Sequence, residues 1–283
     1  MDEYIVKNVK DFRLDHVFDC GQCFRWEKHA DGSYTGTAMD RVVNMQFVCG
    51  DRASEPETTG DLIIKNCTEE DFLQIWKPYL DLDRDYGEIK RTLTADDLVM
   101  GEAVACGQGI RILKQDLWET IVSFIISQNN NIPRIKGCIE NLSQMFGLPA
   151  GEYAGRTYYS LPGPQKLASL TAEDLAPVRL GYRTRYLLET AKMVCEKGLP
   201  EDEVQLSALC GVGPKVANCI LLFSMAKYDS FPIDVWMARV MSQLYGIDEG
   251  DHKGMCTYAQ EHFGQLGGFA QQYLFYYIRE KNR

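Results

Sequence analysis

The chain has 283 residues, of which 30 are Lys or Arg and 40 are Asp or Glu, so its formal net charge is −10 and its pI is near 5.0. A content of 45% hydrophobic residues is that of a globular protein and excludes a disordered chain. Taken alone, the acidity also argues against a nucleic-acid partner, because phosphate binding calls for clustered Lys and Arg.

The first hundred residues are predicted to form short strands separated by turns. Turn dipeptides stand at Asp31-Gly32, Gly50-Asp51 and Gly60-Asp61. Helical spacing of Phe72, Ile75 and Trp76 predicts a helix over 69–79. The strands are expected at 23–28, 34–38, 42–49 and 61–66. These elements indicate a modest antiparallel sheet with one or two helices.

From Gly109 onward the apolar residues recur at helical spacing. Asp116-Leu-Trp-Glu119 has the form of a capping box, and Pro133 suits the first turn of a helix that ends near Phe146-Gly147. Further helices are predicted over 171–178, 184–197, 203–209, 214–226, 235–245, 255–263 and 269–279. We therefore expect an α+β protein in which an antiparallel sheet is followed by an all-α helical core.

The distribution of charge supports a division of the chain into two regions. Residues 1–106 carry 12 Lys and Arg against 22 Asp and Glu, whereas residues 107–283 carry 18 of each. The whole acidic surplus is therefore N-terminal. We predict an N-terminal sheet domain over 1–106 and a helical domain over 107–283, with a helix-hairpin-helix at 203–226.

The sequence shows no targeting signal, and its cysteines do not form a metal-binding pattern, so we expect an intracellular protein without a metal. No run approaches the roughly 18 apolar residues of a membrane span, and Met1-Asp2-Glu3 has no cationic start. The ten cysteines are expected to be reduced core residues. Cys20 and Cys23 form a close pair, but no second pair supplies the other ligands of a zinc site. We expect no metal or other cofactor, and a protein that is neither secreted nor in a membrane.

The segment Cys210-Gly211-Val212-Gly213 forms a glycine turn between two predicted helices. Gly211 and Gly213 can take positive φ at little cost, so their backbone N–H groups could approach a phosphate. The next helix begins at Pro214 and points its free N–H groups at the same place. A Gly-x-Gly pair alone is more often a simple tight turn. With Leu209 before it and Pro214-Lys215 after it, the pattern is typical of the helix-hairpin-helix of DNA-binding proteins.

Lys215 and Asp234 are the candidate catalytic pair. A Lys in the first turn of a helix can be a solvated phosphate contact, but the positive end of the helix dipole favours its neutral amine, which is a nucleophile. Asp234 is predicted to be an N-cap, a role that needs no further function. An amine and an oriented carboxylate suit substitution at a sugar C1′, where the transition state develops positive charge.

These motifs resemble those of a known family. Leu209-Cys-Gly-Val-Gly-Pro-Lys215, followed by Phe231-Pro-Ile-Asp-Val235, is similar to the helix-hairpin-helix DNA glycosylase superfamily, in which the Lys marks bifunctional members. Four further segments, in order and over nearly the whole chain, resemble the 8-oxoguanine DNA glycosylase family. They are Gly21-Gln-Cys-Phe-Arg-Trp26, Ser127-Gln-Asn-Asn-Asn-Ile-Pro-Arg134, Leu180-Gly-Tyr-Arg-Thr-Arg-Tyr186 and Gly268-Phe-Ala-Gln-Gln-Tyr-Leu-Phe275.

The resemblance implies a role for each matching residue. Lys215 would attack C1′ and form a Schiff base, with Asp234 as the catalytic aspartate. Tyr182 would wedge into the gap left by the extruded nucleotide, from an exposed loop tip rather than from the core. The counterparts of the residues that read the opposite cytosine are Asn129, Arg134 and Arg183. The phosphate-binding hairpin would comprise Gly211, Gly213 and Val216.

Recognition of the damaged base is implied for four residues. The backbone carbonyl of Gly21 would accept the N7 proton that 8-oxoguanine has and guanine lacks, and Gln271 would read the Watson–Crick edge. Phe275 and Cys219 would sandwich the ring, although ordinary core packing is an open alternative for both. The sequence departs from animal members of the family at Trp236, Phe223, Ile278 and Asn218, which affects packing and phosphate contacts more than chemistry.

The resemblance therefore implies a bifunctional glycosylase and abasic-site lyase. It would excise 8-oxoguanine, preferably opposite cytosine, from double-stranded DNA, as a monomer, without cofactors, in the cytoplasm, nucleoid or nucleus. Two alternatives stay open from the sequence. One is an enzyme of the same superfamily that acts on another damaged base, and the other is a non-catalytic helix-hairpin-helix protein that only binds DNA.

Overall fold

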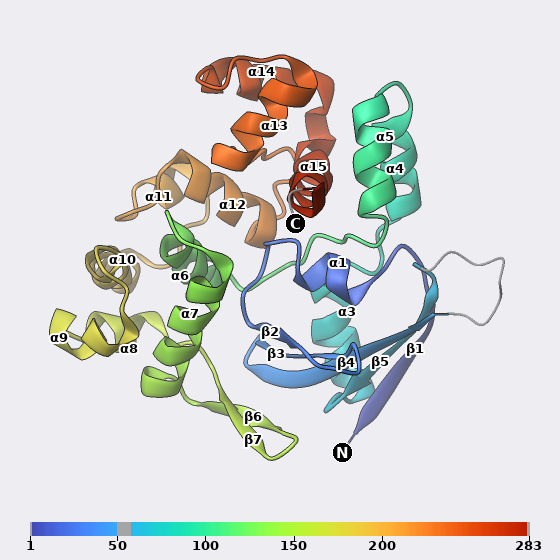
Figure 1. The fold of residues 1–283 in the computed structure, drawn as a ribbon. Coiled ribbons are helices and arrows are strands. Elements are labelled where there is room, and N and C mark those ends of the chain that lie inside the picture. The colour runs from blue at the N-terminus through green and yellow to red at the C-terminus, as the bar shows by residue number, and fades with distance from the viewer. Residues whose placement is uncertain (1, 50–57, 282–283) are drawn as a thin grey trace.

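The computed structural model describes residues 2–49 and 58–281. Figure 1 shows a sheet at the bottom of the molecule, with α6 to α12 to one side and α13 to α15 above, beside α4 and α5. The sheet has five antiparallel strands in the order β1-β5-β4-β3-β2. The α+β fold class is thus confirmed. The elements of this first part are β1 Glu3–Val9, α1 Leu14–Phe18, β2 Trp26–Lys28, β3 Tyr34–Ala38, β4 Arg41–Cys49 and β5 Gly60–Lys65.

Four strands lie where the sequence predicts them, with two differences. β2 begins only at Trp26, because the preceding residues form a loop. β1 was not predicted. Among the described residues it is an edge strand that pairs only with β5, and the two consecutive exposed residues Lys7 and Asn8 break its alternation of exposed and partly buried residues. The predicted turn at Gly50-Asp51 lies outside the described residues.

The helix predicted over 69–79 is present, but one turn of it is wider than an α-helix. α2 Glu69–Asp71 runs through the π-helical segment η1 Phe72–Trp76 into α3 Lys77–Tyr79. Two more helices follow, α4 Tyr86–Thr94 and α5 Leu98–Cys106, capped by Asp85 and Asp97. The expectation of one or two helices in this region was therefore too low.

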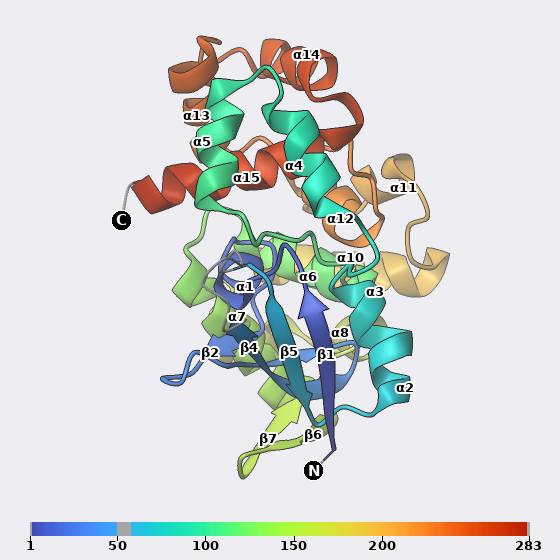
Figure 2. The same ribbon diagram turned by 90° about the vertical axis from the view of Figure 1, so that its right-hand side faces the viewer.

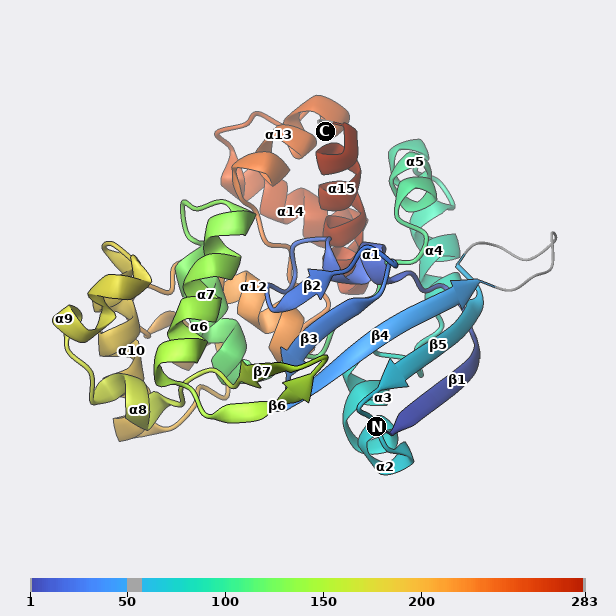
Figure 3. The same ribbon diagram turned by 60° about the horizontal axis from the view of Figure 1, so that its bottom comes forward.

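The second part of the chain is mainly helical, as predicted, except for one hairpin. β6 and β7 are joined by Ala154 and Gly155, which both have positive φ, at 50° and 78°. A turn of this kind usually carries Asn or Asp where Ala154 stands, so the sequence signal was weak. The hairpin lies against β4 of the sheet (Figure 3). The elements of this part are α6 Leu117–Ser127, α7 Ile132–Phe146, β6 Pro149–Tyr153, β7 Arg156–Tyr159, α8 Pro164–Ala168, α9 Ala172–Leu175, η2 Ala176–Val178, α10 Arg183–Lys197, α11 Glu203–Ser207, α12 Pro214–Ser224, α13 Val235–Tyr245, α14 His252–His262, η3 Gly264–Leu266 and α15 Gly267–Lys281.

Two hydrophobic clusters make up the core. One joins the sheet to α1 and to the helix over 69–79, with Trp26 and Trp76 at its centre, in edge-to-face contact. The other joins the helices from α4 to α15, and Ile89 and Met100 on α4 and α5 belong to it. α5 packs across α15 (Figure 2). A domain boundary at residue 106 stays a prediction, and the clusters place α4 and α5 with the helical part.

The segment between α5 and α6 connects the two clusters. Arg111 is buried there and donates hydrogen bonds to the backbone carbonyls of Lys10, Asp11 and Asp81. Within the described ranges, no helix is both long and apolar enough to cross a membrane.

The cysteines only partly follow the expectation of core residues. Five are buried, namely Cys20, Cys23, Cys67, Cys138 and Cys219. For Cys49, Cys195 and Cys256 the expectation was wrong, because these three are exposed.

Candidate active site

The glycine turn lies between α11 and α12, as the sequence predicts. Gly211 has φ 81°, and a Cβ atom built on it would stand 2.5 Å from Cγ of Tyr186, so this position requires glycine. Gly213 differs from the prediction of positive φ. It is the N-cap of α12 with φ −90°, because N-cap residues take extended backbone. A Cβ there would meet nothing within 4 Å, so the space in front of the α12 N-terminus is open.

Lys215 lies in the first turn of α12, and its Nζ atom is 5.4 Å from the ring centroid of Phe124. Within the described part of the chain, Lys215 forms no ion pair with a carboxylate. Burial raises the pKa of the neighbouring Cys219 thiol, and the positive charge of Lys215 partly opposes that rise. The Lys215 amine is thus placed between an aromatic ring and a neutral thiol.

Asp234 is the N-cap of α13, which confirms the prediction. Its Oδ1 atom accepts a hydrogen bond of 2.9 Å from the backbone N–H of Met237. This bond fixes the carboxylate at the mouth of the pocket that Lys215 also lines. Asp234 can cap the helix and still act on a ligand in the pocket, because the cap uses only one of its two carboxylate oxygens.

A small pocket brings together six of the predicted site residues. It is lined by Gly21, Phe124, Lys215, Cys219, Phe223, Pro232, Asp234, Gln271, Gln272 and Phe275. Its volume is about 40 Å³, which is room for little more than one water molecule. A purine is larger than this space, so the walls of the pocket must separate to admit one.

The two sides of this pocket come from distant parts of the chain. Gly21 has φ 88°, and a Cβ atom on it would lie 3.1 Å from Cε1 of Phe275, so a side chain would crowd the ring. Gln271 is buried, and its Oε1 atom accepts a 2.8 Å hydrogen bond from Nε2 of Gln272. Phe124 was not predicted as a site residue, because it lies in the long apolar run of α6. It stacks on Phe223 with ring centroids 5.5 Å apart.

A wide groove of about 730 Å³ opens beside the pocket, and Lys215 and Asp234 line both. Tyr182 stands at its rim with 51% of its surface exposed, which confirms an exposed loop tip rather than a core tyrosine. The side chain of Trp236, 47% exposed, also lines the groove and lies against Arg239. An extended ligand in this groove would pass directly over the Lys215 amine.

The three residues predicted to read the opposite base are placed differently from one another. Asn129 is exposed, has φ 46° and lines the groove. Arg134 is exposed at the start of α7, and its Nη2 atom donates to the carbonyl of Arg179. Arg183 is only 4% exposed and donates to the carbonyls of Gln128, Asn129 and Leu180. In this state Arg183 therefore supports the loop that carries Asn129 instead of presenting its donors to the groove.

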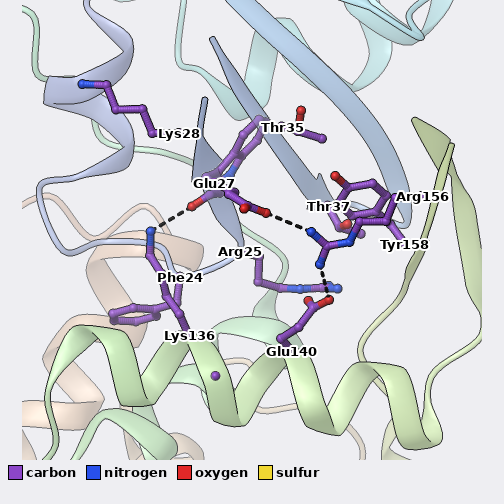
Figure 4. A pocket seen from close by; sticks show the side chains of 12 residues that line it. Phe24, Arg25, Glu27, Lys28, Thr35, Thr37, Lys136, Glu140, Arg156 and Tyr158 are labelled. Atoms are coloured by element: carbon purple, nitrogen blue, oxygen red, sulfur yellow. Dashed lines mark hydrogen bonds and ion pairs between the residues drawn. The ribbon is translucent and has the colours of Figure 1, made fainter. Parts of the chain in front are cut away.

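A separate cleft of about 330 Å³ lies between β2, β3, α7 and β7, and none of the predicted site residues lines it (Figure 4). Arg156 of the hairpin bridges Glu27 on β2 and Glu140 on α7, at 2.9 and 2.8 Å. Lys136 donates to the carbonyl of Trp26. These bonds join the sheet to the helical part.

Comparisons with known proteins agree with the geometry. A family model described as the 8-oxoguanine DNA glycosylase N-terminal domain matches residues 4–121, and one described as an HhH-GPD superfamily base excision DNA repair protein matches residues 122–263.

Several solved structures and one curated relative are similar over most of their length. The 8-oxoguanine glycosylase/lyase of Clostridium acetobutylicum, in complex with double-stranded DNA containing cytosine opposite 8-oxoguanine, is 43% identical with a TM-score of 0.91, over 100% of this chain and 97% of that one. MBOgg1, solved with a low-affinity DNA ligand, is 45% identical with a TM-score of 0.91, over 99% and 96%. The N-glycosylase/DNA lyase OGG1 of Arabidopsis thaliana is 28% identical over 94% of this chain and 77% of its own length.

Proposed function

The chain belongs to the 8-oxoguanine DNA glycosylase family, within the HhH-GPD superfamily of base excision repair proteins, and we propose how its own residues carry out the reaction. The protein is a DNA glycosylase with DNA lyase activity that removes 8-oxoguanine from duplex DNA. The observation that carries the residue assignment is the single pocket that Lys215 and Asp234 share with Gly21, Gln271 and Phe275.

Lys215 is the proposed nucleophile. Its Nζ atom forms a bond to C1′, the bond from C1′ to the base breaks, and the base leaves with the bonding electrons and is protonated. Loss of a proton from the new C–N group and opening of the sugar give a Schiff base between Lys215 and C1′. Removal of a C2′ proton then expels the 3′ phosphate by β-elimination. The position of Lys215 at the junction of pocket and groove supports this role.

Asp234 is proposed to stabilise the positive charge that develops on the sugar as the base departs. A carboxylate with a fixed orientation needs no reorganisation at the moment of reaction, which is the condition for effective electrostatic stabilisation. The hydrogen bond from the Met237 N–H supplies that fixed orientation.

The damaged base is proposed to be recognised by the pocket residues. The carbonyl of Gly21 would accept a hydrogen bond from N7–H of 8-oxoguanine. In guanine N7 has no proton, so its lone pair would face the carbonyl oxygen and no hydrogen bond would form. An unmade buried hydrogen bond costs about 1 to 3 kcal/mol, enough for a preference of roughly five- to 150-fold. Gln271 would read the Watson–Crick edge, and Cys219 and Phe275 would form the two walls once the pocket opens.

The remaining DNA contacts are proposed for the groove. Tyr182 would fill the gap left by the extruded nucleotide, and the N-H groups of the hairpin at Gly211, Gly213 and Val216 would hold a phosphate. Asn129 and Arg134 would read the opposite cytosine. Arg183 can join them only if it exchanges its backbone carbonyl partners for the base.

We also propose that the enzyme works as a monomer inside the cell. One chain supplies both the pocket and the groove, and cellular DNA is the substrate. A non-catalytic DNA-binding protein would have no need for an amine and a carboxylate in one pocket, and the relatives named as glycosylase/lyases favour the enzyme.

Borohydride trapping on duplexes that carry 8-oxoguanine opposite each of the four bases tests this function. We expect a covalent complex that is strongest opposite cytosine and absent with undamaged DNA. A duplex with thymine glycol serves as the control for substrate class, and equal trapping on it would contradict the assignment of the base. No trapped complex on any duplex would contradict the Schiff-base mechanism.

A further inference from the structure

The loop that carries Gly21 lies between α1 and β2, and its C-terminal side is firmly held. Gln22 is completely buried. Its Nε2 atom donates to the carbonyls of Val17 and Arg111, at 2.9 and 2.8 Å, and its Oε1 atom accepts from the N–H of Leu113 at 2.9 Å. The residue directly after Gly21 therefore has all three hydrogen bonds of its amide fixed to backbone groups.

The N-terminal side of the loop is held at Asp19 by two different elements. The Nη2 atom of Arg279, on α15, donates to the backbone carbonyl of Asp19. The hydroxyl of Tyr34, on β3, donates to Oδ2 of Asp19 at 2.5 Å. Among these anchors, Arg279 is the one that comes from the helix which also forms the base pocket.

Arg279 continues a line of pocket residues along α15. Gln271, Phe275 and Arg279 stand at i, i+4 and i+8, so their side chains lie on the same face of the helix. The first two line the pocket, whereas Arg279 does not. The guanidinium carbon of Arg279 is 6.0 Å from the ring centroid of Phe275, and its Nη1 atom is 3.7 Å from the position that a Cβ of Gly21 would take.

Arg279 is a costly residue at this position, because part of its charged side chain is buried without hydrogen-bond partners in the described part of the chain. Its Nε and Nη1 atoms are buried and have no hydrogen-bond partner among residues 2–49 and 58–281. Leaving buried donors open on a charged group is costly, so an apolar side chain of similar length would pack more cheaply on Phe275. What an apolar side chain could not provide is the bond to the Asp19 carbonyl.

We propose that Arg279 is a positioning residue for recognition of the damaged base, which holds the Asp19–Gly21 backbone so that the Gly21 carbonyl stays where it accepts the N7 proton. Arg279 does not touch the base. The inference rests on the proposed role of Gly21, and it assigns to α15 a third task beside reading the edge and forming a wall of the pocket.

Replacing Arg279 should therefore slow only those reaction steps in which the damaged base occupies the pocket. In Arg279→Met the loop loses one anchor, and the excision rate on 8-oxoguanine opposite cytosine should fall about tenfold, the effect of one misplaced hydrogen bond. Nicking of a duplex with a preformed abasic site uses Lys215 but no base, and it should stay within about twofold of wild type. Arg279→Lys keeps one donor for the Asp19 carbonyl and should recover part of the excision rate.

The matched control is Lys281→Met, which removes one positive charge from the same helix at an exposed residue that pairs with Glu102. This variant should excise 8-oxoguanine at the wild-type rate. Equal losses of excision and abasic-site nicking in Arg279→Met would show a general structural role and overturn the proposal, as would wild-type excision in that variant. If the wild-type enzyme itself left 8-oxoguanine untouched while nicking abasic sites, the assignment of the base would fail instead.

Discussion

The Nζ atom of Lys215 lies 5.4 Å from the ring centroid of Phe124, within the distance of about 6 Å at which a ring face attracts a cation. Phe124 in turn stacks on Phe223 and meets Phe24 edge to face. Among the described residues, the amine thus contacts an aromatic cluster and forms no ion pair with a carboxylate. A carboxylate would favour the protonated amine and hold it in place, whereas the ring leaves the amine able to approach a sugar carbon.

Lys215→Gln should abolish excision and borohydride trapping, because the amide nitrogen of Gln is not a nucleophile. Binding to a damaged duplex should persist, since the hairpin and the groove are unchanged. Gel-shift titration and borohydride trapping measure the two properties. Lys227→Gln, beyond the end of α12, is the control and should behave like wild type. Undiminished trapping in Lys215→Gln would remove this residue from the nucleophile role.

Asp234→Asn separates the chemistry of this residue from its capping role. Asn caps a helix as well as Asp, so the free energy of unfolding should change by less than about 0.5 kcal/mol. Excision should fall by about 100-fold or more, because the neutral amide no longer opposes the positive charge on the sugar. Asp251→Asn, at the N-cap of α14, is the matched control and should keep full activity. Near-normal excision in Asp234→Asn would limit Asp234 to the cap.

Gly21→Ala should lose excision of 8-oxoguanine while keeping nicking at abasic sites. The new methyl group would meet Phe275 at 3.1 Å, at a positive φ of 88°. Gly32→Ala is the matched control, because Gly32 has φ 83° but open space around it. Both variants should lose roughly 1 to 2 kcal/mol of stability to backbone strain. Loss of excision in Gly32→Ala as well would show that strain alone, and not the pocket, is responsible.

The stability of the protein should depend on the protonation of His16. This side chain is buried, and its Nδ1 atom accepts a 3.0 Å hydrogen bond from the N–H of Gly109. Burial lowers the pKa of His16 below its ordinary value of 6.5, so the folded protein holds neutral imidazole while the unfolded chain gains a proton as the pH falls through 6.5. The stability that neutral His16 contributes is thus present above pH 6.5 and lost below it.

Urea unfolding of wild type and His16→Gln at several pH values measures this contribution. Between pH 7.5 and 5.5 the free energy of unfolding should fall more steeply in wild type than in His16→Gln. The difference in slope should be at most about 1.4 kcal/mol per pH unit, the value for one proton. His252→Gln, at an exposed position on α14, should follow the wild-type curve. Parallel curves for wild type and His16→Gln would contradict the prediction.

The salt dependence of DNA binding should be shallow for a DNA-binding protein. The groove is lined by few basic side chains, Lys215 and His252, alongside the acidic Glu249 and Asp234. With about two to four phosphates neutralised, the plot of log K against log salt should have a slope of roughly −2 to −4. A slope that corresponds to about eight phosphates would contradict this account of the net charge of −10.

Local signals predicted the elements around the site well. α13 begins and ends at the predicted residues, because Asp234 caps its start and Gly246, with φ 71°, ends it. The positive φ of Gly211 and the exposed position of Tyr182 were predicted for similar reasons. In each case residues that are neighbours in the sequence decide the local structure, so a short stretch of sequence is sufficient.

Long-range contacts could not be predicted in the same way. Phe124 looks like any apolar residue of a buried helix, and only the packing of α6 on α12 brings it to Lys215. Arg183 matches the motif of a residue that reads the opposite base, but its side chain donates hydrogen bonds to the backbone carbonyls of Gln128 and Asn129. Arg279 meets Asp19 across almost the whole chain. The sequence order contains no signal for such pairs until the fold is known.

The packing of α15 on α5 has a consequence for the order in which the protein is made. A ribosome releases α5, residues 98–106, long before α15, residues 267–281. The sheet cluster is complete once Leu113 has emerged, whereas α4 and α5 keep an uncovered apolar face until α15 is synthesised. Gln271 and Phe275 arrive on that same helix, so the nascent chain has no base pocket. A translation product that stops before α15 would therefore be both poorly folded and unable to recognise damage.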